Sequence, residues 1–255
     1  MKQQPKFIPG IYNYCDRWCE RCSFTSRCRN YEDTSKLSRE QLDPKNKAFW
    51  KGISDNFEKA GKLLHKAAKK YGIDLSQPLS AEEEKAYEER KSFIESEVKK
   101  HELYSLCRKY CNTVVSYFEK NLSQDLVDKT RQLISHLHMG MNTPEDVAYT
   151  MAGLGECEQV INWYLHFIEA KLRRALQGKL KDDEDDSFPK DSEGSAKIAI
   201  IAIERSMGAW VRLYEMLPVA EDTALPVLSI LSRLKEVAVK EFPKAMEFHR
   251  PGFDD

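Results

Sequence analysis

Residues 143–172 read TPEDVAYTMAGLGECEQVINWYLHFIEAKL, and this stretch decides the fold class. It opens on threonine, proline and two acids. That order is typical of a helix start, because proline suits the first helical position and acids suit the positive end of the helix dipole. Apolar residues then recur at three- or four-residue steps, namely Val147, Met151, Leu154, Ile161, Leu165, Ile168 and Leu172. The spacing predicts one long amphipathic helix.

The rest of the chain carries the same spacing. A helix is predicted over residues 46–71, ended by Gly72, and another begins at a capping box formed by Ser80 and Glu83. No proline or glycine follows until Gly140. A single helix over that whole stretch would be too long for a compact domain, so we place a break near residues 121–123. Further helices are predicted over 195–217 and 223–242. Residues 35–255 are therefore predicted to form an all-α bundle of about five to seven helices, with an acidic loop at 179–194.

Composition excludes several classes of protein. The chain has 255 residues, 40 basic and 41 acidic side chains, and 41% hydrophobic residues, which is enough for a packed core. The balanced charge argues against a dedicated nucleic-acid binder, although residues 1–30 are locally basic and keep that class as a weaker alternative. The longest aliphatic run, residues 198–203, is far short of the roughly 20 needed to cross a bilayer. Neither this run nor the N-terminus resembles a membrane or secretory segment, so we expect a cytoplasmic protein with no membrane partner.

Four of the seven cysteines lie within residues 14–28, which read YCDRWCERCSFTSRC. They are Cys15, Cys19, Cys22 and Cys28, spaced C-x3-C-x2-C-x5-C. Four thiolates in so short a segment can converge on one centre with little loop-closure cost. Arginines between and after them would offset the negative charge of the ligand set. The sequence therefore predicts a metal site in a small N-terminal segment, residues 1–34.

The compact spacing favours a [4Fe–4S] cluster, with Zn²⁺ as the alternative cofactor. The first three cysteines match the cluster motif of radical S-adenosylmethionine enzymes. The helical remainder lacks that family's β/α barrel, and a fourth cysteine would fill the open iron position. Cys19-x2-Cys22-Ser-Phe-x3-Cys28-Arg resembles the cysteine tail that holds an iron–sulfur cluster in RecB-like nucleases. That resemblance covers about ten residues, and it implies a cluster and no particular activity.

Two acids occupy predicted apolar faces. Glu158 lies in register with Leu154 and Ile161, and Glu204 follows the aliphatic run at 198–203. Each is expected to find a partner inside the bundle, since an unpaired buried carboxylate is costly. No histidine has an acid three residues before it, so the Glu-x-x-His pattern of a ferritin-like dimetal centre is absent. The remaining cysteines, Cys107, Cys111 and Cys157, are expected to be buried and to behave as small hydrophobes.

The leading interpretation is an interaction or regulatory module with a protein partner, in which the metal orders the N-terminal segment. A structural role is favoured because four cysteine ligands leave no open coordination position. The alternative is an iron–sulfur redox protein, or an enzyme subunit that uses Glu158 and Glu204. No phosphate-binding loop, dinucleotide fingerprint or hydrolase motif is present, so the sequence leaves open whether the chain is an enzyme.

Overall fold

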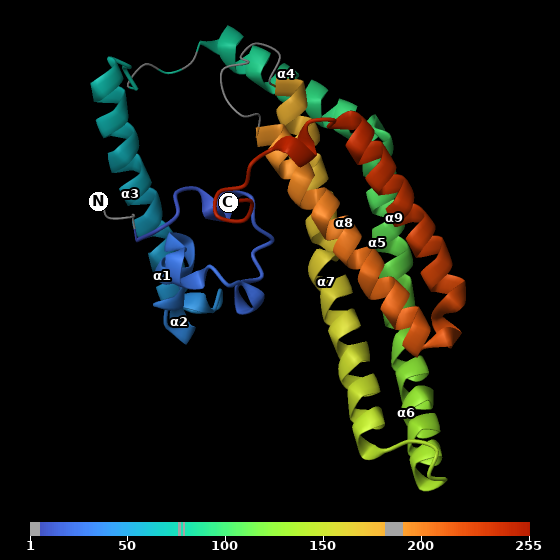
Figure 1. Cartoon of the computed structure of the whole chain (residues 1–255). Coiled ribbons are helices and arrows are strands. Elements are labelled where there is room, and N and C mark those ends of the chain that lie inside the picture. The colour runs from blue at the N-terminus through green and yellow to red at the C-terminus, as the bar shows by residue number, and fades with distance from the viewer. Residues whose placement is uncertain (1–5, 76–77, 79, 182–190) are drawn as a thin grey trace. The chain divides into compact units, whose positions relative to one another are not determined.

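The computed structural model describes residues 6–75, 78, 80–181 and 191–255. Within these residues every regular element is helical, as Figure 1 shows, so the predicted all-α class is confirmed. The α-helices are α1 (Arg29–Ser35), α2 (Arg39–Leu42), α3 (Lys47–Tyr71), α4 (Ala81–Lys100), α5 (Glu102–Tyr117), α6 (Ser123–His138), α7 (Pro144–Lys181), α8 (Asp191–Met216) and α9 (Glu221–Glu241). Across the described residues their number is slightly above the predicted range, because short helices precede α3.

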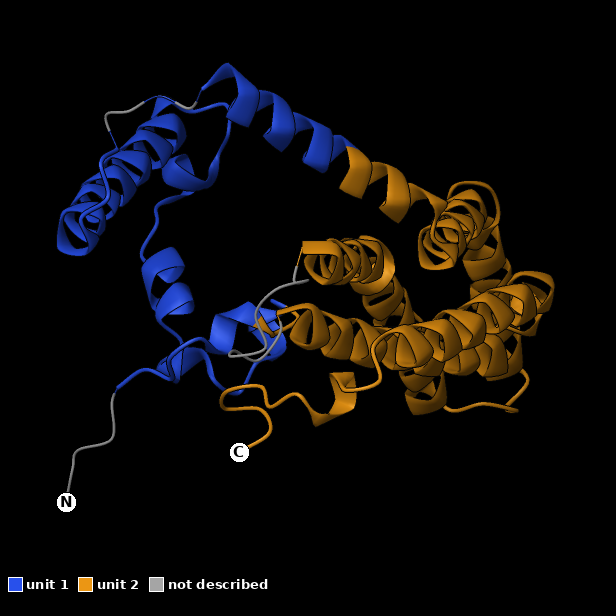
Figure 2. Ribbon diagram, turned by 90° about the horizontal axis from the view of Figure 1, so that it is seen from above, with its two compact units in different colours: residues 1–13, 17–92 blue, residues 14–16, 93–255 orange. Residues whose placement is uncertain are grey.

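The chain divides into two compact units, coloured separately in Figure 2. Unit 1 comprises residues 1–13 and 17–92, and unit 2 comprises residues 14–16 and 93–255. Three residues near the N-terminus therefore belong with the C-terminal helices. The predicted boundary at residue 34 stays a prediction.

Unit 1 contains α1, α2, α3 and the first part of α4. Helix α3 begins and ends where the sequence predicts. The Asn46 side chain accepts a hydrogen bond from the Ala48 N–H at 2.9 Å, and Gly72 closes the helix in the left-handed conformation with φ 69°. Of the apolar stripe along α3, only Ala68 is buried.

Unit 2 is a helical bundle whose core lies between α5, α7, α8 and α9. The long helices α7 and α8 lie side by side and run in opposite directions (Figure 1). The N-terminus of α7 is the predicted one. The Thr143 hydroxyl accepts a hydrogen bond from the Asp146 N–H at 3.2 Å, and the Asp146 carboxylate accepts from the Thr143 N–H at 2.9 Å. Ile161, Ile168 and Leu172 from the predicted stripe are fully buried.

The helix does not end near residues 121–123, so the break predicted there is wrong. Residues Phe118–Leu122 form a π-helical turn that joins α5 to α6 without ending the helix. The interruption lies earlier, at His101, whose ring nitrogen Nδ1 accepts a hydrogen bond from the Leu103 N–H at 3.1 Å. Histidine is not among the usual capping residues, so sequence pattern alone does not predict a helix start after His101.

The acidic loop predicted at 179–194 is shorter than expected at both ends. Helix α7 continues to Lys181, and α8 already begins at Asp191. Lys179 near the end of α7 reaches the Glu241 carboxylate at 2.8 Å, which supports the extra helical turn. The centre of the predicted loop, residues 182–190, lies outside the described residues.

Lys197 of α8 binds several of the C-terminal residues and holds them against that helix. The Lys197 side chain is nearly buried, and its ammonium group donates to the backbone oxygens of Met246 and Phe248 at 3.2 and 2.7 Å. It also pairs with the Asp254 carboxylate at 2.7 Å. Arg250 binds the same carboxylate at 2.8 Å. A buried ammonium is tolerated here because it has three acceptors.

Candidate functional site

The four clustered cysteines fall in both units of the chain. Cys15 belongs to the three-residue segment of unit 2, whereas Cys19, Cys22 and Cys28 belong to unit 1. All four are half-buried, and none forms a disulfide. Each group is therefore described within its own unit.

Asp16 attaches the segment next to Cys15 to the bundle. Its carboxylate accepts hydrogen bonds from the Tyr164 hydroxyl at 2.7 Å and from the Arg205 guanidinium, and its backbone oxygen accepts from the Trp163 indole at 3.0 Å. Burial and the bond to Asp16 raise the pKa of Tyr164 to about 12, so this hydroxyl stays a donor. Cys15 is thus held on one side by two helices, α7 and α8.

Tyr14 attaches the other side of Cys15. Its hydroxyl donates to the Asp191 carboxylate at 3.0 Å, and Arg174 holds that carboxylate with two bonds of 2.9 and 2.8 Å. The Tyr14 ring meets the Phe248 ring edge-on, with centroids 4.6 Å apart. A β-carbon at Gly194 would lie 2.5 Å from the Tyr14 ring, so the absence of a side chain lets the ring lie against α8.

The chain turns sharply immediately after Asp16. Arg17 has φ 60°, a left-handed conformation that is uncommon for residues other than glycine. The Arg21 guanidinium then stacks over the Trp18 ring at 4.1 Å from its centre. A cation over an indole face is favourable, and it keeps this arginine beside the cysteine segment.

Cys19 and Cys22 form the ends of one tight turn in unit 1. The Cys22 N–H donates to the Cys19 backbone oxygen at 3.2 Å, a bond that keeps the α-carbons of the two residues within roughly 7 Å. The Cys22 sulfur accepts a hydrogen bond from the Phe24 N–H at 3.4 Å. This bond fixes the orientation of the Cys22 side chain within the turn.

Cys28 follows a second tight turn, in which its N–H donates to the Thr25 backbone oxygen at 3.2 Å. The neighbouring Arg27 backbone oxygen accepts from the Ile8 N–H at 3.0 Å, which joins this turn to the preceding chain. Short turns of unit 1 therefore hold Cys19, Cys22 and Cys28, and helices of unit 2 hold Cys15, a set of four candidate sulfur ligands. Such a set fits tetrahedral Zn²⁺ and a [4Fe–4S] cluster alike.

Glu204 has a cation partner, as the sequence predicts, but the pair lies at the surface and not inside the bundle. Glu204 is exposed and pairs with Lys235 at 2.8 Å across α8 and α9. Glu158 is half-buried. The predicted stripe passes close to both residues, but each lies at the edge of the buried face, where a carboxylate reaches water.

Cys107, Cys111 and Cys157 are buried, as predicted. Burial raises the pKa of Cys111 to about 11, and Glu169 contributes to that shift. However, Cys111 is more than a core residue, because ligand atoms of Cys111, His166 and Glu169 all lie within 4.8 Å of one another. The Glu-x-x-His pattern has the acid three residues before the histidine, whereas Glu169 lies three residues after His166. The reversed His-x-x-Glu order is the sequence signal for this pair.

Comparison of the chain with protein-family models, curated proteins and solved structures gives no match. Among the described residues, no helix combines the length and the apolar character that crossing a membrane requires.

Proposed function

We propose that Cys15, Cys19, Cys22 and Cys28 bind one metal centre, a [4Fe–4S] cluster in preference to Zn²⁺, and that the chain acts as a metal-dependent interaction module. The attachment of Tyr14 and Asp16 to α7 and α8 carries this proposal. It fixes the residues on both sides of Cys15, so one ligand has a defined position before any metal binds. Pre-positioning a ligand lowers the entropy cost of forming the site.

The module role follows from the composition of the segment. Residues between Cys15 and Cys28 are mostly polar or charged, and the structure holds them by short turns with few buried side chains. Such a segment gains folding energy from metal ligation that its own apolar contacts do not supply. When bound, the metal would therefore order a basic surface carrying Arg17, Arg21 and Arg27. We propose a protein partner in the reducing cytoplasm, where clustered thiols remain available for metals.

Half-burial of the four cysteines favours a second function, electron transfer. A cluster near the surface can exchange electrons with a partner without an open coordination position. This alternative predicts that dithionite bleaches the visible absorbance of the protein and that air restores it. The module role predicts a partner interaction that is the same in both oxidation states.

Limited trypsin digestion tests the ordering role, because several cleavage sites lie among the cysteines. We expect Cys22→Ser to speed cleavage after Arg17, Arg21 and Arg27, while the bundle stays resistant. Cys157→Ser is the matched control, since it replaces a buried cysteine of α7 outside the segment. Equal cleavage rates in wild type and Cys22→Ser would contradict the proposal.

A further inference from the structure

A second group of side chains of the types that bind metals lies between α5 and α7, within unit 2. Cys111 comes from α5, and His166 and Glu169 come from one face of α7, three residues apart. Leu165 and Ile168, each one position earlier on α7, are buried in the core. The histidine and the glutamate therefore line the edge of the apolar interface rather than its centre.

The three ligand atoms are close to the spacing that a tetrahedral ion requires. The Cys111 sulfur lies 4.0 Å from His166 Nδ1 and 3.9 Å from Glu169 Oε2. Bonds of about 2.3 Å to sulfur and about 2.0–2.1 Å to nitrogen and oxygen imply ligand–ligand distances of about 3.5–3.6 Å in a tetrahedron. Movements of about half an ångström would bring the sulfur to this spacing from both other ligand atoms, and the nitrogen and oxygen atoms lie within 4.8 Å of each other.

The contacts already made by these side chains leave them able to bind an ion. The Cys111 thiol donates to the Leu165 backbone oxygen at 3.3 Å, a weak bond that a metal can replace. The nearby Arg173, one turn after Glu169, pairs with Glu95 on α4, with the guanidinium nitrogen 3.9 Å from the carboxylate oxygen. The Glu169 carboxylate instead faces the sulfur of Cys111.

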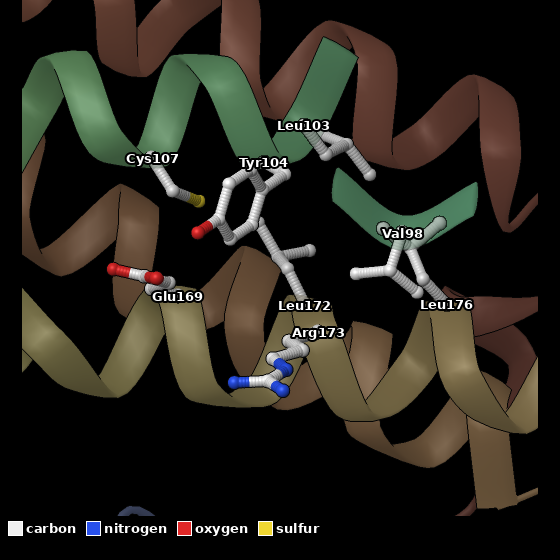
Figure 3. A pocket seen from close by; sticks show the side chains of 8 residues that line it. All are labelled: Val98, Leu103, Tyr104, Cys107, Glu169, Leu172, Arg173 and Leu176. Atoms are coloured by element: carbon white, nitrogen blue, oxygen red, sulfur yellow. The ribbon is translucent and has the colours of Figure 1, made fainter. Parts of the chain in front are cut away.

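The three side chains have apolar residues on one side and solvent on the other. Figure 3 shows Cys107 and Glu169 at one end of a narrow pocket whose other end is lined by Val98 and Leu176. Cys111 is 3% exposed, Glu169 is half-buried and His166 is exposed. An ion could therefore enter from the side of His166. Its fourth position would face water, which is the arrangement of zinc sites with three protein ligands.

We propose that Cys111, His166 and Glu169 bind one divalent transition-metal ion of the zinc class. A mixed sulfur, nitrogen and oxygen donor set suits zinc and its neighbours, whereas Mg²⁺ and Ca²⁺ prefer oxygen alone. On binding, the thiol proton leaves to solvent and sulfur bonds to the metal. One thiolate and one carboxylate then balance the 2+ charge of the ion. This site shares no residue with the N-terminal cysteines, so either proposal can fail alone.

Cobalt titration of the full chain tests the site, because Co²⁺ occupies zinc sites and a Co²⁺–thiolate bond absorbs in the near ultraviolet. The background variant carries Cys15→Ser, Cys19→Ser, Cys22→Ser and Cys28→Ser, which removes the other thiol cluster. We expect one Co²⁺ per chain, a charge-transfer band of single-thiolate intensity, and displacement of the ion by equimolar Zn²⁺.

Single substitutions in this background then assign the ligands. Cys111→Ser should abolish the charge-transfer band, and His166→Ala and Glu169→Gln should each weaken Co²⁺ binding roughly tenfold or more. Cys157→Ser should bind as the background does, since its thiol is buried elsewhere on α7. Cobalt binding that survives Cys111→Ser, or that is lost equally in Cys157→Ser, overturns the proposal.

A second comparison holds even if the background variant does not fold. In the otherwise unmodified chain, Cys111→Ser should bind one Co²⁺ fewer than wild type while its helical circular dichroism is unchanged. Equal Co²⁺ stoichiometry in the two proteins would overturn the proposed ligand set.

Discussion

The hydroxyl of Tyr164 donates a hydrogen bond of 2.7 Å to the carboxylate of Asp16, 148 residues earlier in the chain. The contact is one of several that hold residues 14–16 on α7 and α8. It links the middle of the bundle to the residue beside Cys15, the first of the clustered cysteines. The attachment of residues 14–16 should therefore contribute to the stability of the bundle, and substitutions can test this contribution.

Asp16→Ala should lower the free energy of unfolding by about 1.5–3 kcal/mol, because it leaves the hydroxyl of the buried Tyr164 and the guanidinium of the exposed Arg205 without a charged acceptor. Tyr164→Phe should cost about 1 kcal/mol. Urea unfolding measures both. The matched control is Glu156→Ala, which removes another acid–arginine pair between α7 and α8, at the surface, and should cost much less. Equal losses in Asp16→Ala and Glu156→Ala would show that residues 14–16 are not attached as described.

Gly194→Ala should destabilise the protein by about 1–3 kcal/mol, since the new methyl group would lie 2.5 Å from the Tyr14 ring and 2.7 Å from the Phe248 ring. Gly208→Ala on the same helix is the control. Its β-carbon meets no atom within 4 Å, so the higher helix propensity of alanine should stabilise by up to about 1 kcal/mol. Thermal unfolding of the two variants should therefore shift in opposite directions. A shift in the same direction would argue against the packing of Tyr14 on α8.

Asp254 should make stability depend on acid pH. Its bond to Arg250, together with Lys197, holds the pKa of this carboxyl well below its usual range. Because the folded pKa is depressed, the stabilisation is complete above the unfolded value of about 3.9 and is lost as the pH falls below it toward the folded value. The difference in unfolding free energy between wild type and Asp254→Asn should be constant from pH 7 to about pH 4 and should begin to narrow between about pH 4 and pH 3. A constant difference over that range would rule out this linkage.

Ser206→Ala should leave stability unchanged or raise it by up to about 1 kcal/mol. The Ser206 hydroxyl is buried beside the Tyr110 hydroxyl, and among the described residues neither group makes a hydrogen bond of good geometry, so removing the Ser206 hydroxyl relieves a desolvation cost. Thr143→Ala provides the contrast. Its hydroxyl caps α7, and its loss should cost about 1 kcal/mol. Urea unfolding in which Ser206→Ala loses as much as Thr143→Ala would indicate that a bound water or other partner satisfies Ser206.

Local signals in the sequence predict much of the fold. The threonine–proline start of α7, the capping residue Asn46 and the terminal Gly72 act through neighbouring backbone atoms, so they can be identified without tertiary information. The stop at His101 and the π-helical turn that follows α5 depend on less common local geometry. The sequence pattern therefore misplaced the interruption between α4 and α6.

The same limit applies to functional side chains. The clustering of four cysteines within residues 14–28 is visible in the sequence, but the attachment of Asp16 to Tyr164 depends on tertiary packing. The grouping of Cys111 with His166 arises because α5 packs against α7. Glu204 was expected inside because helical spacing locates an apolar face only to within about one residue, and it lies just outside that face.

Metal content and the visible spectrum of protein purified without oxygen test the central claim most directly. We expect a brown wild-type protein with about four irons per chain, as one [4Fe–4S] cluster requires, and a colourless Cys22→Ser protein that has lost this iron. Loss of one zinc instead of iron in Cys22→Ser would keep the four-cysteine centre and change its metal. Identical metal content in wild type and Cys22→Ser would contradict the claim that these cysteines bind a metal.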